Sequence, residues 1–198
     1  MKSNSERTIL ITGGAGFIGS NLLLFLAGKH KNWRLINLDK LTYAADLSVL
    51  KALDNNPNYI FVKGDICDEN LIKKLFAEYK IDGVMHLAAC SHVDNSIKSP
   101  KEFIKTNIEG TFTLLDGTYH AWHYGPFKVK DEYKNARFHI ISTDEVYGSL
   151  ETGSFTELSR FAPNSPYSAS KASADMLARI TERADSSNVT LGRRSVGT

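Results

Sequence analysis

The sequence Thr8-Ile9-Leu10-Ile11-Thr12-Gly13-Gly14-Ala15-Gly16-Phe17-Ile18-Gly19 joins an apolar run to a cluster of glycines. The run 8–11 is bounded by turn residues and predicts a buried first strand. In such a unit, Gly13 would permit a tight turn, Gly16 would let the backbone approach a pyrophosphate, and Gly19 would let the following helix pack on the strand. The helix N-terminus then offers free N–H groups to the phosphates. On the glycines alone, an ordinary turn remains the alternative.

An acidic residue follows the second apolar run. Residues 34–38 predict a strand that leads into Asp39, which lies 20 residues past Gly19. At that distance a dinucleotide-binding unit places the carboxylate that binds the adenosine ribose. Its charge would repel a 2′-phosphate, so Asp39 favours NAD over NADP. The alternative is a solvated loop aspartate.

The rest of the chain alternates between the two kinds of pattern. Further strands are predicted at 59–62, 83–89 and 138–141, and helices at 46–53, 71–79 and 100–122. Residues 124–137 are polar and basic and predict a surface loop. The repeated β-α order predicts an α/β fold, a doubly wound parallel sheet of Rossmann type with strand order 3-2-1-4-5.

Composition favours one globular, cytoplasmic domain. The 198 residues are 42% hydrophobic and 23% charged, and the formal charge of +2 gives no case for nucleic acid or a membrane surface. Residues 1–7 are polar without a signal-peptide core, and the longest apolar run, 22–27, is too short to span a bilayer. Cys67 and Cys90 lack metal or redox spacing and fit a reducing compartment.

A second stretch, Ser142-Thr143-Asp144-Glu145-Val146-Tyr147-Gly148, carries the chemistry. It follows a predicted strand, and ligands of open α/β sheets bind at the carboxyl ends of strands. Two adjacent carboxylates there cost desolvation energy and indicate a function, with a surface turn as the alternative. Tyr167 and Lys171 follow at i and i+4 and share one helix face. The lysine is expected to lower the pKa of Tyr167, which makes the phenol a usable base.

Other polar residues leave alternatives open. Asp65 follows the third predicted strand and could meet an adenine or cap a helix. His120 and His123 are spaced for one helix face, but no third metal ligand is evident, so a solvated or capping role is favoured over a metal site. Thr106 and Asn107 are polar residues on an otherwise apolar stretch.

Together these motifs resemble the extended short-chain dehydrogenase/reductase family, and within it the dTDP-glucose 4,6-dehydratases. The resemblance covers roughly residues 7–180 and rests on segments 12–19, 39–44, 64–68, 86–89, 91–94, 106–107, 142–148 and 165–173. The glycine motif and Tyr-x-x-x-Lys are typical of the whole superfamily. Thr-Asp-Glu before Val-Tyr-Gly indicates a sugar-nucleotide 4,6-dehydratase, because epimerase relatives lack the Asp-Glu pair.

The resemblance implies a reaction and a role for each residue. With NAD as the cofactor, Tyr167 would remove the proton of the sugar 4-hydroxyl, Lys171 would hold Tyr167 ionised, and Thr143 would hydrogen-bond the 4-oxygen. Glu145 would abstract the C5 proton, and Asp144, kept protonated by burial, would protonate the departing 6-hydroxyl. The residues implied to contact NAD are Gly13, Gly16, Phe17, Ile18, Gly19, Asp39, Lys40, Thr42, Asp65, Ile66, Leu87, Ala88, Ala89, Thr106, Tyr167 and Lys171. The nucleotide-sugar substrate would contact Ser91 and Thr143.

Two features depart from the family pattern. Cys90 stands where the family usually has glutamate, which affects the support of Ser91 and the nicotinamide pocket. After Arg183 the sequence stops resembling the family, and the chain ends 27 residues past Lys171, whereas family members continue into a domain that grips the substrate nucleotide.

We therefore expect residues 1–198 to form an NAD-binding Rossmann domain that carries the catalytic residues but lacks the C-terminal substrate domain. A bare sheet edge beside the fifth strand, with an uncovered apolar patch, would favour a homo-oligomer. Two alternatives remain open: a non-catalytic NAD-binding fragment, and a UDP-sugar 4-epimerase relative.

Overall fold

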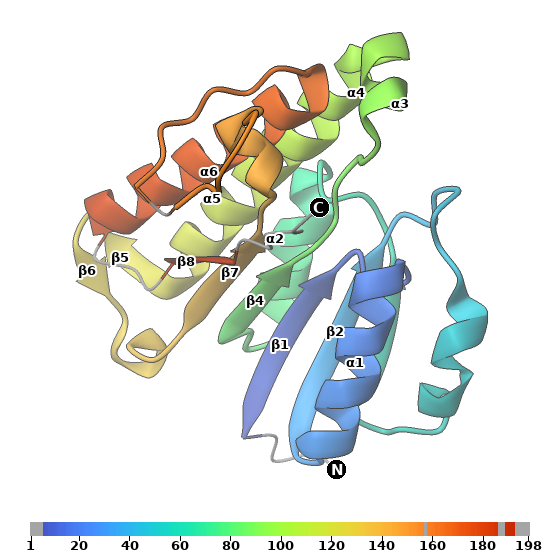
Figure 1. Ribbon diagram of the computed structural model, residues 1–198. Coiled ribbons are helices and arrows are strands. Elements are labelled where there is room, and N and C mark those ends of the chain that lie inside the picture. Colours follow the sequence, from blue (N-terminus) through green and yellow to red (C-terminus); the bar gives the residue numbers. More distant parts are fainter. Residues whose placement is uncertain (1–5, 157, 186–188, 193–198) are drawn as a thin grey trace.

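One parallel sheet forms the centre of the protein. A computed structural model describes residues 6–156, 158–185 and 189–192 (Figure 1). Within these ranges six strands follow the order β3-β2-β1-β4-β7-β8. They are β1 (Arg7–Thr12), β2 (Trp33–Asp39), β3 (Tyr59–Lys63), β4 (Gly83–His86), β7 (Arg137–Ile141) and β8 (Val189–Gly192). The first five reproduce the predicted order 3-2-1-4-5, so the doubly wound parallel fold is confirmed.

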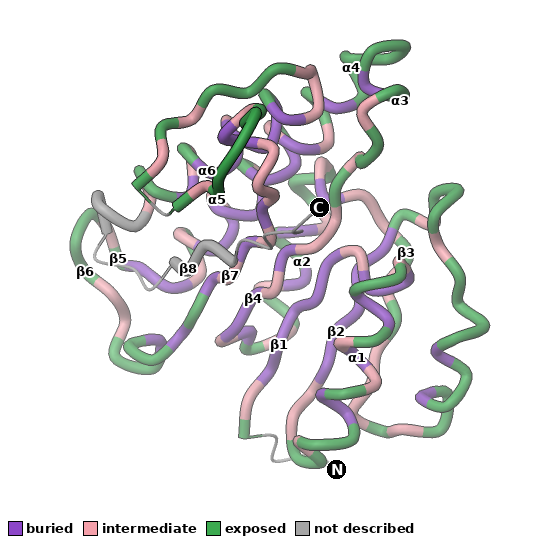
Figure 2. The backbone as a smooth tube through the Cα atoms, in the orientation of Figure 1, coloured by how far each residue is buried: buried purple, intermediate pink, exposed green. Residues whose placement is uncertain are grey.

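Helices cover both faces of the sheet, because successive strand residues point to opposite sides. Ile9 and Ile11 of β1 pack on one face with α1 (Phe17–Lys29) and the 3₁₀ helix η1 (Leu47–Leu53). Leu10 packs on the other face with α2 (Glu69–Glu78), α5 (Thr111–Trp122) and α6 (Pro166–Asp185). Figure 2 shows the central strands mostly buried, whereas the outer sides of the helices are exposed.

The predicted long helix at 100–122 changes its winding along its length. It comprises α4 (Pro100–Phe103), the π-helical segment η2 (Ile104–Gly110) and α5, and it is preceded by the short α3 (Val93–Lys98). Gly110 packs against the Ile66 side chain, where a Cβ would lie 2.6 Å from Ile66 Cδ1. A π-helical turn accommodates an extra residue and is frequent at functional sites. Here the segment contains the buried Asn107.

The sheet extends one strand further than the sequence analysis predicted. The expected bare edge beside β7 is wrong, because β8 pairs with it in parallel, from Phe138 opposite Val189 to Ile141 opposite Gly192. The Val-Thr-Leu triplet of β8 is too short to give a clear strand signal.

The predicted surface loop at 124–137 is also wrong in part. It contains most of a small antiparallel hairpin, β5 (His123–Gly125) and β6 (Lys128–Val129), followed by the 3₁₀ turn η3 (Asp131–Tyr133). Tyr133 is buried and stacks on Trp122 with ring centroids 6.1 Å apart. Burial of this aromatic side chain anchors a segment whose other residues are polar.

Candidate active site

The glycine-rich turn after β1 is shaped by the close approach of two backbone segments. Gly13 has a φ of +72°, and a Cβ on it would lie 2.7 Å from the Ala88 backbone nitrogen. A Cβ on Gly19 would collide with the Gly13 carbonyl oxygen. At Gly16, by contrast, the nearest atom to an added Cβ is 3.4 Å away. Gly16 also precedes the first turn of α1, whose free N–H groups point out of the helix end.

Asp39 ties this turn to the end of β2. Its Oδ2 accepts a hydrogen bond from Ala15 N at 2.9 Å, and its Oδ1 accepts one from Leu41 N at 2.8 Å. Beside it, Lys40 Nζ forms an ion pair with Asp65 Oδ2 at 2.7 Å. Of the two alternatives for Asp65, the helix cap is wrong, because Asp68 caps α2 by accepting from Leu71 N.

The carboxyl end of β7 leads into the Asp-Glu pair. Residues Asp144–Tyr147 form the 3₁₀ turn η4, and Thr143 caps it by accepting a hydrogen bond from Glu145 N at 3.3 Å. Thr143 Oγ1 also donates to Asp144 Oδ1 at 3.3 Å. A short turn thus holds the threonine and both carboxylates on one segment.

Helix α6 brings Tyr167 and Lys171 to the same place. Ser165 Oγ accepts from Ser168 N at 3.0 Å, and Ser168 Oγ accepts from Ser165 N at 2.9 Å, so the helix start is capped reciprocally. The rings of Tyr167 and Phe103 meet edge to face, with centroids 6.3 Å apart. Lys171 is buried and donates from Nζ to the Ile141 carbonyl oxygen at 2.6 Å.

Electrostatics show that the predicted catalytic groups lie within reach of one another, but they correct one expectation. Burial raises the pKa of Tyr167, the charges of Glu145 and Asp144 raise it further, and a hydrogen bond with Thr143 lowers it. The predicted lowering of this pKa by Lys171 is therefore not observed. Lys171 Nζ instead donates a hydrogen bond to the Ile141 carbonyl oxygen, and burial lowers the pKa of Lys171 to about 8.

The burial of the two carboxylates differs from what the sequence analysis expected. Asp144 is only half-buried, so the expected burial of this carboxylate is not observed. The pKa of Glu145 is raised, chiefly by burial and then by the charge of Asp144. A raised carboxyl pKa brings Glu145 closer to the range of a general base at neutral pH.

The loop after β4 is clasped to α6 by one buried amide. Asn107 accepts from Cys90 N at 2.8 Å and donates to Cys90 O at 3.0 Å and to Ser170 Oγ at 2.9 Å. Ser170 in turn donates to the Tyr167 carbonyl oxygen at 2.7 Å. Cys90 is thus held by its backbone, and among the described residues its side chain makes no hydrogen bond.

The remaining predicted residues fall into two groups. Most are half-buried or exposed. Phe17 and Ile18 begin α1, Thr106 lies in η2, and the others follow the carboxyl ends of β2, β3 or β4: Lys40, Thr42, Asp65, Leu87, Ala88, Ala89 and Ser91. Ile66 differs, because its side chain is buried in the core against Gly110. The predicted contact of Ile66 with NAD stays a prediction and, because this side chain is buried, would involve the Ile66 backbone.

The sequence analysis assigned no role to a buried network that underlies these loops. His86 Nδ1 bonds Thr12 Oγ1 at 2.7 Å, and its Nε2 bonds Thr111 Oγ1 at 2.9 Å. Thr111 donates to Asn107 O at 2.7 Å, which leaves its oxygen to accept from His86. Only pairing across β1, β4 and α5 reveals this network, although the polar Asn107 on an apolar stretch was a partial signal.

The histidines considered for a metal site have other partners. His120 Nε2 lies 3.5 Å from Asp116 Oδ1, and the His123 ring stacks on Tyr119 with centroids 5.0 Å apart. Across the described ranges, no group of three or more His, Cys, Asp or Glu residues could hold a metal ion. In the same ranges, no helix is both long and apolar enough to cross a membrane.

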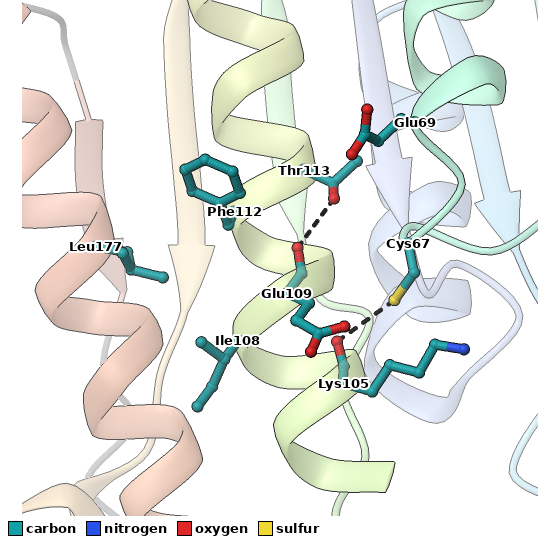
Figure 3. Close-up of a pocket in the computed structure, with 8 residues that line it drawn as sticks. All are labelled: Cys67, Glu69, Lys105, Ile108, Glu109, Phe112, Thr113 and Leu177. Atoms are coloured by element: carbon teal, nitrogen blue, oxygen red, sulfur yellow. Dashed lines mark hydrogen bonds between the residues drawn. The ribbon is translucent and has the colours of Figure 1, made fainter. Parts of the chain in front are cut away.

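A pocket of about 530 Å³ lies beside α2, η2, α5 and α6 (Figure 3). Its lining residues are Cys67, Glu69, Lys105, Ile108, Glu109, Phe112, Thr113 and Leu177. Burial, followed by the charge of Asp65, raises the pKa of the Cys67 thiol to about 11, and Cys67 Sγ donates to Lys105 O at 3.4 Å. A thiol with so high a pKa is a poor nucleophile.

Comparison with known proteins identifies the family of this chain. Residues 10–195 match the family model described as GDP-mannose 4,6 dehydratase. The chain belongs to this family. Because the match continues past Arg183, the expectation that the family resemblance ends there is wrong; β8 lies within the matched range.

Two groups of relatives make the likeness more specific. The dTDP-glucose 4,6-dehydratase of Haemophilus influenzae is 51% identical over 179 residues, covering 88% of this chain and 51% of the relative. That of Neisseria gonorrhoeae is 48% identical over 185 residues, covering 92% and 52%. The chain therefore spans about half the length of the curated relatives it matches.

Solved structures agree with the fold. The dTDP-glucose 4,6-dehydratase of Streptomyces venezuelae, crystallised with NAD and TYD, has a TM-score of 0.81 at 41% identity and covers 94% of this chain and 55% of its own. The UDP-Glc/GlcNAc 4-epimerase of Campylobacter jejuni has a TM-score of 0.82 at 26% identity, covering 94% and 53%. The folds are equally similar, but the sequence is closer to the dehydratase.

Proposed function

We propose that this chain is the NAD-binding and catalytic part of a sugar-nucleotide 4,6-dehydratase that converts dTDP-glucose to dTDP-4-keto-6-deoxyglucose. One observation carries the proposal: Thr143, Asp144 and Glu145 meet Tyr167 at the carboxyl end of β7. Epimerases need the tyrosine but not the carboxylate pair. Residues 1–198 then act as one Rossmann domain, and the curated relatives support this assignment.

The strand ends fit NAD. The turn carries no side chain at Gly13 or Gly16, and the N-terminus of α1 that follows suits a pyrophosphate. Asp39 stands at the end of β2, where its free lone pairs suit ribose hydroxyls. Lys40, Thr42 and Asp65 would border the adenosine. NAD, when bound, supplies a hydride acceptor that later returns the hydride.

The side chains at β7 and α6 would move the protons. Tyr167 would take the proton of the 4-hydroxyl, with Thr143 hydrogen-bonded to the same oxygen. Glu145 would remove the C5 proton, which a 4-keto group makes acidic, and its raised pKa supports this role. Asp144 would donate a proton to the departing 6-hydroxyl. Ser91, exposed after β4, would contact the sugar.

The decisive experiment is to incubate the protein with NAD and dTDP-glucose and assay for the 4-keto-6-deoxy product. UDP-glucose serves as the control substrate, with UDP-galactose as the product that would reveal an epimerase. Formation of the 4-keto product supports the dehydratase. NAD binding without any turnover would favour the non-catalytic alternative and overturn the proposed activity.

Cofactor choice has its own test. Calorimetry with NAD and NADP is expected to detect binding of NAD alone, because the charge of Asp39 would repel a 2′-phosphate. An Asp39→Asn variant should narrow this difference. Equal affinities of the unmodified chain for the two cofactors would remove the role given to Asp39.

We also propose that a second copy of this chain covers the outer face of α5 and α6. Ile104 and Phe112 on the α4–η2–α5 helix and Met176 and Ile180 on α6 are exposed large apolar side chains. Phe112 also lines the pocket of Figure 3, together with Ile108 and Leu177. Contiguous apolar patches of this kind mark association surfaces.

Two phenylalanines with equal exposure provide a matched test of this surface. Phe112 on α5 and Phe25 on α1 are each 56% exposed. Size-exclusion light scattering should give a dimer for the unmodified chain, a monomer for Phe112→Lys and a dimer for Phe25→Lys. A monomeric unmodified chain would contradict the proposal.

The proposed dehydratase activity implies a cytoplasmic enzyme, and this location fits Cys67 and Cys90 as free thiols.

A further inference from the structure

Two neighbouring residues at the end of β7 are held by two residues one turn apart on α6. Lys171 Nζ donates to the Ile141 carbonyl oxygen at 2.6 Å. Ser142 Oγ donates to Asp175 Oδ2, also at 2.6 Å. Lys171 and Asp175 are related by i and i+4, so they project from the same side of the helix. The next residue along the chain from Ser142 is Thr143, the first of the catalytic segment.

Asp175 is an unusual residue to find at this position. Its exposed fraction is 0%, and that of Lys171 is 6%. Buried charges are costly unless they are paired and hydrogen-bonded. Its neighbours Ala174 and Ala178 on α6 are core residues, so an apolar side chain of similar volume would suit the packing. The proton transfers assigned to Tyr167 and the carboxylates make no use of Asp175.

The charge of Asp175 acts on Lys171. Burial lowers the pKa of Lys171 to about 8, and the aspartate opposes this effect by raising it. On the other side, the charge of Lys171 adds to burial in lowering the pKa of His86 on β4 to about 3. His86 is therefore neutral near pH 7, and Asp175 is the anion that acts on the lysine. Tyr167, one turn before Lys171 on α6, is a further titratable group near this lysine.

We propose that Asp175 is a positioning residue that holds Lys171 charged and Ser142 in place, and so sets Thr143, Asp144 and Glu145 against Tyr167. This inference rests on the proposed function for its consequence in catalysis. The contact between Asp175 and Ser142 does not depend on the proposed function. Asp175 would touch neither the sugar nor the cofactor, and it would act only through Lys171 and Ser142.

The ionisation of Lys171 gives a readout that needs no turnover. Carbon-13 NMR of lysine Cε resonances should contain one that titrates near pH 8, and Lys171→Met should remove it. In Asp175→Asn the amide oxygen can still accept from Ser142 Oγ, but the charge is gone. The midpoint should then fall by at least about one pH unit, the usual effect of a close opposite charge. An unmoved midpoint would overturn the proposal.

Further variants separate the effect of the Asp175 charge from the effect of its hydrogen bond to Ser142. Asp175→Glu should restore the midpoint, whereas Ser142→Ala should leave it near that of the unmodified chain. Asp131→Asn is the matched control, because Asp131 is an exposed aspartate paired with Lys134 at 2.9 Å. If Asp175→Asn does not fold, Asp175→Ser, which also lacks the charge, takes its place, and the midpoint should fall in the same way. An unmoved midpoint in Asp175→Ser would overturn the charge role.

The dependence of kcat on pH then tests the consequence for catalysis. The kcat of Asp175→Asn should fall at least tenfold near pH 8 and recover as the pH is lowered, because acid restores the lysine charge. Ser142→Ala should lower kcat by a similar factor at every pH. A pH-independent loss in Asp175→Asn would contradict the role through Lys171. An inactive unmodified chain with a shifted NMR midpoint would instead reject only the proposed function.

Discussion

The two sides of the candidate site are built in different ways. At the ends of β1 and β2, the backbone makes the site: Gly13 approaches the Ala88 main chain, and Asp39 binds two backbone N–H groups. At the end of β7, buried side chains make it, through Lys171 and the Ser142–Asp175 contact. A backbone-built surface fails when a Cβ is added. A side-chain-built surface fails when a charge or hydroxyl is removed.

The largest effect is expected on the side-chain-built half. Tyr167→Phe removes the proposed base of the first step, and general acid–base groups contribute roughly 10²–10⁴-fold to rate. Product formation should fall by that factor in a turnover assay, while calorimetric affinity for NAD changes little. A full rate in Tyr167→Phe would show that another group takes the 4-hydroxyl proton.

Glu145→Gln should divide the reaction instead of stopping it at the start. Oxidation at C4 should persist, visible as the near-ultraviolet absorbance of reduced cofactor, while loss of water slows by roughly 10²–10⁴-fold. Exchange of the C5 proton with deuterated water, followed by NMR, should disappear with it. Unchanged exchange at C5 would exclude Glu145 as the base. The contrast with Tyr167→Phe separates two steps that share one surface.

The backbone-built half is tested by a pair of glycines. Gly13→Ala forces a Cβ into a left-handed backbone and against Ala88, and such strain costs about 1–3 kcal/mol. Both the free energy of unfolding and the affinity for NAD should fall. Gly28→Ala in α1 is the control, because an added Cβ there meets no atom within 4 Å. It should stabilise the protein by roughly 0.5–1 kcal/mol. Equal effects in the two variants would contradict the steric argument.

The last prediction concerns the His86 network that lies beneath the loops of the candidate site. Burial lowers the pKa of His86 to about 3, so the folded protein keeps it neutral while the unfolded chain protonates it near pH 6.5. Stability is therefore complete above pH 6.5 and declines as the pH falls toward 3. Between pH 7 and 5 this histidine should remove about 2 kcal/mol from the free energy of unfolding. Denaturant titrations should give a shallower pH dependence for His86→Gln, and an unchanged slope would contradict the assignment.

The sequence predicted the fold well because its signals are local. The strand ending at Thr12, the glycine turn and the strand ending at Asp39 each carry their own pattern, and alternation of helices and strands does the rest. Strand β8 was missed because three β-forming residues give too weak a signal without a paired neighbour. The hairpin at 123–129 was missed because burial of Tyr133 depends on Trp122, which only the folded chain brings near it.

The candidate site was predictable where motifs carry it and not where contacts do. Tyr167, Lys171 and the Thr-Asp-Glu segment came from spacing, and the structure brings them together. The prediction of a lowered pKa for Tyr167 was wrong because spacing cannot tell which acceptor receives the hydrogen bond of the lysine. In the structure that acceptor is the Ile141 carbonyl. The contacts of Asn107 and Asp175 were invisible for the same reason, since their partners lie far away in sequence.

The central place of β1 has a consequence for how the protein is made. Ile9 pairs with Leu35 on β2 but also with Gly83 on β4, much later in the chain. While the ribosome is still synthesising the intervening residues, β1 and β2 can already pair, and the second edge of β1 stays open. Exposed strand edges recruit other chains, and late long-range pairing prolongs that exposure. Newly made chains of this protein should therefore depend on chaperones most strongly before β4 emerges.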